Sequence, residues 1–219
     1  METRIKEEAD LKKFIKYVSK KRWNSYWHQI DEIIANTPHS SYESSILEIG
    51  VGYNVLKTIC KDLLHYNYET LDINGEFYPD HIGSVLEMPF ADNKYDTVVC
   101  FQMLEHLPYE DFNKALSEIF RVAKASVIIS LPNTGLIIPL HIPIIFEKKF
   151  IKLPIDISSK KKLKTKSHQW EINFKNYKLK DVMKSILKTG ESYNFKLTKN
   201  YRVWENPYHH FFVLIKTKK

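Results

Sequence analysis

A repeating order of short apolar runs and amphipathic segments constrains the fold of this chain more than any other feature. Residues 46–49 form a short, mainly apolar strand pattern, a helical pattern follows through Leu63, and residues 68–71 form a second strand pattern. Strand, helix and strand in this order predict a βαβ unit with parallel strands. Residues 95–101 contain Val98, Val99 and Cys100 in succession without alternation, which is typical of a strand covered on both faces. We therefore expect an α/β protein with helices on both faces of its sheet.

The second half of the chain continues this order and then changes it. Pro108 opens a helical pattern, and residues 127–131 form the next apolar run. After a further helix that ends at Gly190, two strands are predicted at residues 195–203 and 211–215. Because neighbouring strands joined by so short a turn run in opposite directions, this last pair is expected to be antiparallel.

Two segments differ from the rest of the chain. Residues 1–40 carry two apolar stripes at helical spacing and predict an N-terminal helical cap, which leaves residues 41–219 as the main domain. Residues 133–175 interrupt the order of strands and helices, begin apolar and end basic, and are too long for an ordinary connection. This insertion is therefore expected to cover an active site or to bind substrate.

The charge balance limits the kinds of partner. The 33 basic and 26 acidic side chains leave a formal net charge of +7, which suits an anionic partner. Part of the excess lies in the lysine run at residues 160–166, which is typical of a solvated loop but also suits a phosphate group or an acidic membrane. No aromatic side chain is interleaved with these lysines, and no nucleic-acid motif appears. We therefore expect a small-molecule substrate and no nucleic acid.

Cysteine usage and hydropathy indicate the cellular context. Cys60 and Cys100 are too few for a disulfide framework or a four-cysteine zinc site, and are expected to be inert packing thiols. No apolar run reaches the roughly 20 residues of a transmembrane helix, and the N-terminus lacks the apolar stretch of a signal peptide. A cytoplasmic protein is expected. Alternation places His209 and His210 on opposite faces of a strand, and no metal site is predicted.

A glycine turn marks the expected ligand site. The first predicted strand ends in Gly50-Val51-Gly52, where the glycines allow the backbone to turn sharply and to lie against a ligand. The helix that follows offers unpaired amide groups at its start. Asp72 ends the second strand about 20 residues after Gly52, the separation at which an acidic side chain reaches ribose hydroxyls. The pattern predicts a ligand that contains adenosine.

Two residues narrow the choice among adenosine ligands. The dinucleotide fingerprint needs a third glycine where this chain has Val55. Glu48, just before the glycine turn, would repel a diphosphate but could pair with the ammonium group of an amino acid. A ligand without phosphates is therefore favoured, and an NAD-dependent oxidoreductase is the weaker hypothesis.

Four motifs between residues 45 and 132 resemble those of the class I S-adenosylmethionine-dependent methyltransferases. They are 47–52 (LEIGVG), 71–73 (LDI), 83–90 (GSVLEMPF) and 95–108 (YDTVVCFQMLEHLP). The resemblance implies a Rossmann-like sheet of seven strands, mostly parallel with an antiparallel last strand. It also implies S-adenosyl-L-methionine as the cofactor and methyl transfer from its sulfonium by in-line displacement.

The resemblance assigns cofactor contacts motif by motif. They are Glu48, Gly50 and Gly52 at the methionine part, Asp72 with Ile73 at the ribose, Ser84 and Val85 at the adenine edge, and Phe101 and Gln102 at the sulfonium side. One position departs from the family pattern, because many relatives carry an acid where this chain has Ser84. A hydroxyl accepts a hydrogen bond from the adenine amino group more weakly than a carboxylate does.

Two histidines compete for the catalytic role, since histidine is the side chain best suited to take a proton at neutral pH. His106 follows the fourth strand at the sheet edge where ligands bind, although its Glu-His-Leu-Pro motif could simply brace the loop. His168 is preferred as the base, because Trp170 and Glu171 beside it supply an apolar wall and an acceptor. Trp170 could equally pack in the core. The residues predicted to bind substrate are Trp170, Glu171, Tyr208 and His209.

The segments outside the motifs would choose the methyl acceptor. Residues 1–40 and 133–175 are aromatic and basic, which favours O-methylation of a small anionic molecule, such as a phosphorylated or nucleotide-linked sugar of a surface polysaccharide. Residues 136–146 are apolar and precede the lysine run, which suggests a quinone or lipid-like acceptor at a membrane surface as the rival. A noncatalytic scaffold that serves a partner enzyme is a third hypothesis, disfavoured because the motif residues are intact.

Overall fold

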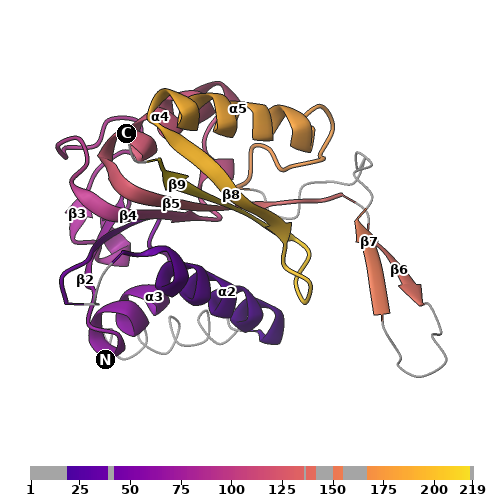
Figure 1. Cartoon of the computed structure of the whole chain (residues 1–219), viewed down its shortest axis with the longest axis horizontal. Helices are drawn as coiled ribbons and strands as arrows, with labels where there is room; N and C mark the ends of the chain where they lie inside the picture. The colour runs from indigo at the N-terminus through magenta and orange to yellow at the C-terminus, as the bar shows by residue number, and fades with distance from the viewer. Residues whose placement is uncertain (1–18, 39–41, 136, 142–149, 155–166, 218–219) are drawn as a thin grey trace, which may run out of the picture.

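The computed structural model describes residues 19–38, 42–135, 137–141, 150–154 and 167–217. A twisted central sheet carries helices on both of its faces (Figure 1). Among the helices in these ranges, not one combines the length and the apolar character that a membrane crossing requires.

The main sheet has seven strands in the order β3-β2-β1-β4-β5-β9-β8. The strands are β1 (Ser45–Ile49), β2 (Asn67–Asp72), β3 (His81–Ile82), β4 (Tyr95–Phe101), β5 (Ala123–Pro132), β8 (Phe195–Arg202) and β9 (His209–Lys216). Neighbours from β3 to β5 are parallel, whereas β9 is antiparallel to both β5 and β8. The predicted α/β fold, mostly parallel with one antiparallel strand near its end, is confirmed.

Helices cover both faces of the main sheet, as expected for strands in which apolar and polar residues do not alternate. One face carries α4 (Phe112–Val122) and α5 (Leu179–Ser192), and the other carries α2 (Lys20–Asn36), α3 (Val55–Lys57) and the π-helical turn η1 (Thr58–Leu63) (Figure 1). Three single turns, η2 (Gly75–Phe77), η3 (Leu104–His106) and η4 (Tyr109–Asp111), lie in the connections. Buried apolar side chains form one cluster on each side of the sheet. Cys60 and Cys100 are both buried, as predicted for packing thiols.

Helix α2 belongs to the part of the predicted N-terminal cap that the structure describes, and it packs directly on the sheet. Ile33 is fully buried in the core cluster of that face. The Glu32 carboxylate accepts a hydrogen bond from the Tyr201 hydroxyl at 2.9 Å and pairs with the Lys199 ammonium at 2.8 Å, both on β8. These contacts fix the helix beside the carboxyl ends of the central strands.

The insertion contains a second, two-stranded sheet that the sequence did not predict. Strands β6 (Ile137–His141) and β7 (Phe150–Pro154) pair antiparallel and stand away from the main sheet (Figure 1). The lysine run at residues 160–166 lies outside the described residues, as do residues 136 and 142–146 of the apolar run. The end of the insertion returns to the main domain, where the Gln169 amide donates to the Glu105 carbonyl at 2.9 Å. This return places His168 next to the segment that follows β4.

Candidate active site

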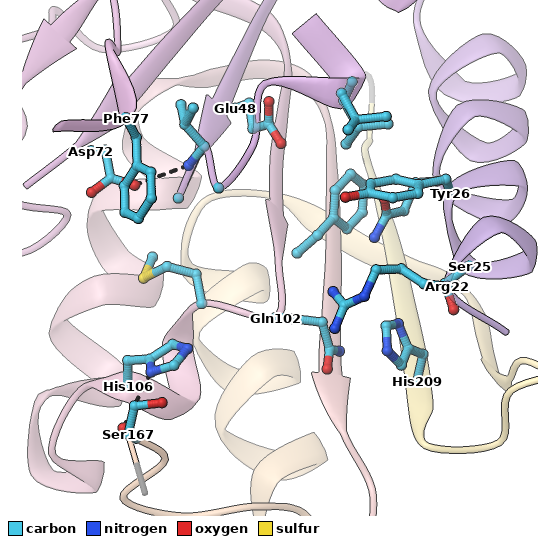
Figure 2. Close-up of a pocket in the computed structure, with 18 of the residues that line it drawn as sticks. Arg22, Ser25, Tyr26, Glu48, Asp72, Phe77, Gln102, His106, Ser167 and His209 are labelled. Atoms are coloured by element: carbon cyan, nitrogen blue, oxygen red, sulfur yellow. Dashed lines mark hydrogen bonds between the residues drawn. The ribbon is translucent and has the colours of Figure 1, made fainter. Parts of the chain in front are cut away.

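A cavity of about 1020 Å³ opens at the carboxyl ends of the central strands, with α2 along one side (Figure 2). This is the edge at which open α/β sheets bind their ligands. All the residues predicted to contact the cofactor line it, together with both candidate catalytic histidines and two of the predicted substrate contacts. These residues are Glu48, Gly50, Gly52, Asp72, Ile73, Ser84, Val85, Phe101, Gln102, His106, His168, Tyr208 and His209.

The glycine turn after β1 has backbone angles that residues with a side chain adopt only with strain. Gly50 and Gly52 have φ angles of +84° and +56°, which favour glycine. A Cβ atom on Gly50 would lie 2.5 Å from the Cγ atom of Met103, so a side chain there would also collide with the loop after β4. The turn therefore brings main-chain atoms against the cavity.

Asp72 holds this turn as well as facing the cavity. Its Oδ2 atom accepts a hydrogen bond from the Val51 amide at 3.0 Å, and its Oδ1 atom accepts one from the Asn74 amide at 2.8 Å. A carboxylate has about four acceptor positions, so two remain for the hydroxyls of a ribose. The structure thus gives Asp72 a second role, in orienting the glycine turn, which its place in the sequence did not indicate.

Glu48 is a buried carboxyl group at the inner end of the cavity. The residue is 4% exposed, and its Oε2 atom has no hydrogen-bond partner among the described residues. Burial raises the pKa of Glu48 to about 8, against the lowering effect of the Tyr68 hydroxyl and with a further raising effect of Asp72. An ammonium group bound here would stabilise the ionised form.

The raised pKa of Glu48 predicts a pH-dependent stability. Between about pH 4.5 and 8 the carboxyl is ionised in the unfolded chain but protonated in the fold. The unfolded state then binds fewer protons, so the free energy of unfolding falls as pH rises through this window, by at most about 1.4 kcal/mol per pH unit for one group. Glu48→Gln should flatten this slope in denaturant titrations from pH 5 to 8. Equal slopes for both proteins would contradict the assignment.

At the ends of β4 and β3, the structure places the residues predicted for the sulfonium and adenine sides. Gln102 has a left-handed backbone with φ of +54°, and its backbone N–H donates to the Ser130 carbonyl at 2.9 Å. This backbone geometry directs the Gln102 side chain into the cavity (Figure 2). The Ser84 hydroxyl accepts a hydrogen bond from the Leu86 amide at 3.1 Å. This bond leaves the hydroxyl one further acceptor position for an adenine amino group.

Helix α2 contributes side chains that the sequence analysis missed. Arg22, Ser25, Tyr26 and Gln29 line the cavity, and Figure 2 shows Arg22 extending from the helix toward Gln102. Their spacing of three and four places them on one helix face. That spacing was a usable signal, but the sequence assigned acceptor choice to residues 1–40 as a whole and singled out none of these side chains.

His168 and His106 lie together at the end of the cavity formed by the insertion. The Nδ1 atom of His168 is 2.8 Å from the Oε1 atom of Glu171, which also accepts a hydrogen bond from the Tyr208 hydroxyl at 2.7 Å. The Nδ1 atom of His106 is 3.2 Å from the Ser167 carbonyl oxygen. The two rings meet edge to face with centroids 4.8 Å apart. Burial lowers the pKa of His106, and His168 lowers it further.

The other predicted substrate residues take different positions. Trp170 is fully buried and packs against the rings of Tyr109, Phe112 and Tyr177, so the structure places it in the core and outside the cavity lining. The interpretation of this indole as an apolar substrate wall is corrected accordingly. Glu171 is also fully buried and outside the lining, where it acts on the site through His168.

Part of this chain, which includes most of the predicted cofactor contacts, is similar in sequence to known proteins. Residues 47–131 match the family model of a methyltransferase domain. Among curated proteins, the uncharacterized protein MJ0638 of Methanocaldococcus jannaschii is 33% identical over 86 residues. This match covers 36% of the present chain and 36% of the relative, so it spans about a third of the length of that protein.

Solved structures share the fold over most of the chain. Magnesium protoporphyrin IX methyltransferase from Synechocystis PCC 6803 with bound SAH has a TM-score of 0.58 and 13% identity, over 90% of this chain and 83% of its own. The 1,6-didemethyltoxoflavin-N1-methyltransferase of Burkholderia thailandensis has a TM-score of 0.50 and 10% identity, over 90% and 86% of the two chains. At these identities the likeness establishes the fold.

The sheet order and the ligand edge define a Rossmann-like methyltransferase fold. With the family match over residues 47–131, the chain carries a methyltransferase domain of this fold, as the sequence motifs predicted. The Synechocystis enzyme of this fold has been solved both with bound SAH and with bound SAM.

Proposed function

We propose that the protein transfers the methyl group of S-adenosylmethionine to an oxygen atom of a small anionic acceptor. The observation that carries this proposal is the distribution of charge along the cavity. Glu48 and Asp72 lie where the cofactor is expected, whereas Lys21 and Arg22 line the side formed by α2. A basic wall beside the acceptor position suits a phosphate or carboxylate group, which a guanidinium binds with two parallel hydrogen bonds.

The reaction places limited demands on the protein. A lone pair of the acceptor oxygen forms a bond to the methyl carbon, the carbon–sulfur bond breaks, and its electron pair stays on sulfur to give S-adenosylhomocysteine. The acceptor hydroxyl releases its proton. We assign the assistance of this release to His168, with His106 beside it, because both side chains line the cavity and Glu171 orients the His168 ring.

A phosphorylated or nucleotide-linked sugar is the acceptor that best suits this wall, and a cytoplasmic location is part of the proposal. The polar character of the α2 side supports an anionic acceptor over a quinone or lipid. Besides Arg22, that side presents Ser25 and Asn206, which are hydrogen-bonded to each other at 2.9 Å.

Methyl labelling tests the proposed acceptor class. The protein is incubated with S-adenosylmethionine labelled in its methyl group and with a metabolite extract, which is then divided into anionic, neutral and solvent-extracted fractions. We expect the label in small molecules that an anion exchanger retains. Label in the solvent-extracted fraction would favour the quinone or lipid acceptor, and no transferred label in any fraction would favour a noncatalytic scaffold.

Arg22→Gln tests the basic wall. The loss of a hydrogen bond between charged groups costs about 1.5–3 kcal/mol, so the KM for the acceptor should rise by at least tenfold while the affinity for S-adenosylmethionine stays unchanged. Lys20→Gln is the matched control, because it removes the same charge from α2 at an exposed position outside the cavity lining. An equal effect of the two variants would contradict a direct contact.

A further inference from the structure

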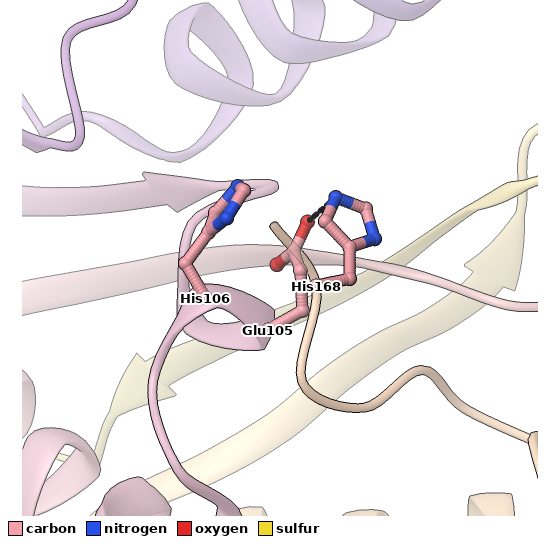
Figure 3. A group of neighbouring side chains, drawn as sticks. All are labelled: Glu105, His106 and His168. Carbon is pink, nitrogen blue, oxygen red and sulfur yellow. Dashed lines mark ion pairs between the residues drawn. The ribbon is translucent and has the colours of Figure 1, made fainter. Parts of the chain in front are cut away.

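We propose that Glu105, His106 and His168 form a binding site for a divalent transition-metal ion of the zinc class at the acceptor end of the cavity. The three side chains converge from two segments that are far apart in the sequence, η3 and the end of the insertion (Figure 3). One ligand atom of each lies within 4.8 Å of the corresponding atoms of the other two. The sequence predicted no metal site, because the cysteines are too few and because His209 and His210 were expected on opposite faces of a strand.

The hydrogen bonds of the two rings leave the same nitrogen available on each. The Nδ1 atoms of His106 and His168 face acceptors, the Ser167 carbonyl and the Glu171 carboxylate. A neutral imidazole facing an acceptor carries its proton on that nitrogen, so each Nε2 atom has a lone pair. Histidines that bind metals commonly donate their other ring N–H to a carboxylate or a carbonyl in this manner.

Glu105 provides the observation that points to a cation. Its side chain is fully buried, and neither carboxyl oxygen has a hydrogen-bond partner among the described residues. The Nε2 atom of His168 lies 3.8 Å from its Oε1 atom, which is too long for a hydrogen bond. Both oxygens of this buried carboxyl group thus lack a hydrogen-bond partner among the described residues, and unpaired polar groups of this kind are costly inside a protein.

The donor set and the spacing indicate which ion fits. Two imidazoles and one carboxylate are a ligand set of catalytic zinc sites, which leave a fourth position for water or substrate. Metal–ligand bonds of about 2.0–2.2 Å require ligand atoms roughly 3.3 Å apart, so the side chains would move inward by about 1 Å. His106 and His168 line the cavity, which gives the ion a path of entry and an open position that faces the acceptor.

An ion at this site would account for the role of both histidines. An acceptor hydroxyl bound to the open position releases its proton more readily, and the ionised oxygen is held for attack on the methyl carbon. This role in methyl transfer rests on the function proposed above, whereas the binding of the ion does not.

Titration of the full, chelator-treated protein with Co²⁺ and with Zn²⁺ tests the site without substrate or cofactor. We expect one equivalent of Co²⁺ per chain, with a visible absorption band that Zn²⁺ abolishes. Glu105→Gln, His106→Asn and His168→Asn should each weaken binding by at least tenfold. Glu171→Gln should weaken it by about ten- to a hundredfold, because Glu171 orients a ligand.

His65→Asn is the matched control. His65 is exposed and has a left-handed backbone with φ of +60°, which asparagine adopts readily, so Co²⁺ binding should be unchanged. Saturable binding that the three ligand variants leave intact, or no saturable binding to the unaltered protein, would overturn the site. His106 is exposed, so His106→Asn remains informative even where Glu105→Gln, at a buried residue, disturbs folding. Normal S-adenosylmethionine binding alongside absent Co²⁺ binding would remove the metal site and leave the proposed function standing.

Discussion

Replacing His168 with asparagine is expected to lower the turnover of methyl transfer by about a hundredfold or more, the scale of assisted proton transfer. The affinity for S-adenosylmethionine should not change, because His168 lies among residues of the insertion and the loop after β4, the end of the cavity that we assign to the acceptor. Turnover is measured with the acceptor identified by methyl labelling, and cofactor affinity is measured by calorimetry.

The control for this variant is His65→Asn, which changes an exposed histidine by the same substitution. Turnover close to that of the unaltered protein in His168→Asn would contradict the assignment and transfer the role to His106 or to no side chain. A parallel loss of cofactor affinity would also count against it, because that result indicates a disturbed cavity.

Asp72→Ala should weaken S-adenosylmethionine binding by about 1.5–3 kcal/mol, which is roughly tenfold to 150-fold. Two effects contribute. The variant removes the acceptor for the ribose hydroxyls, and it leaves the amides of Val51 and Asn74 without the carboxylate that now holds them at 3.0 and 2.8 Å. Calorimetry on the purified protein measures the change.

Asp62→Ala, an exposed position on the neighbouring π-helical turn, removes an equal charge and should leave the affinity unchanged. Asp72→Asn separates the two effects, because its amide oxygen still accepts from one backbone amide while the charge is lost. An affinity in Asp72→Ala equal to that of the unaltered protein would refute the ribose contact.

Most of the succession of strands and helices along the chain could be predicted, because burial and the period of apolar residues determine it. The run at residues 95–101 became β4 with the same limits, and the antiparallel end of the sheet followed from the short turn before β9. The hairpin of β6 and β7 was not foreseen, since its sequence is apolar and interrupted by prolines, which disfavours a regular strand. The π-helical turn η1 likewise has no distinct sequence pattern.

The position of a site residue could be predicted where a motif places it at the end of a strand. It was harder to predict where side-chain packing determines whether the residue faces the cavity or the core. Gly50 and Asp72 occupy the positions expected from the strand ends. Trp170 was ambiguous because a loop has no period that separates an inward from an outward side, and it entered the core. Glu105 was not considered at all, since a carboxylate beside a histidine gives no sign in the sequence that it is buried.

Calorimetric titration of the purified protein with S-adenosylhomocysteine, compared with NAD, tests the central claim most directly, namely that this cavity holds a sulfonium nucleoside without phosphates. The account predicts saturable binding of one equivalent of S-adenosylhomocysteine and no measurable binding of NAD. Binding of NAD in the absence of any binding of S-adenosylhomocysteine or S-adenosylmethionine would contradict it.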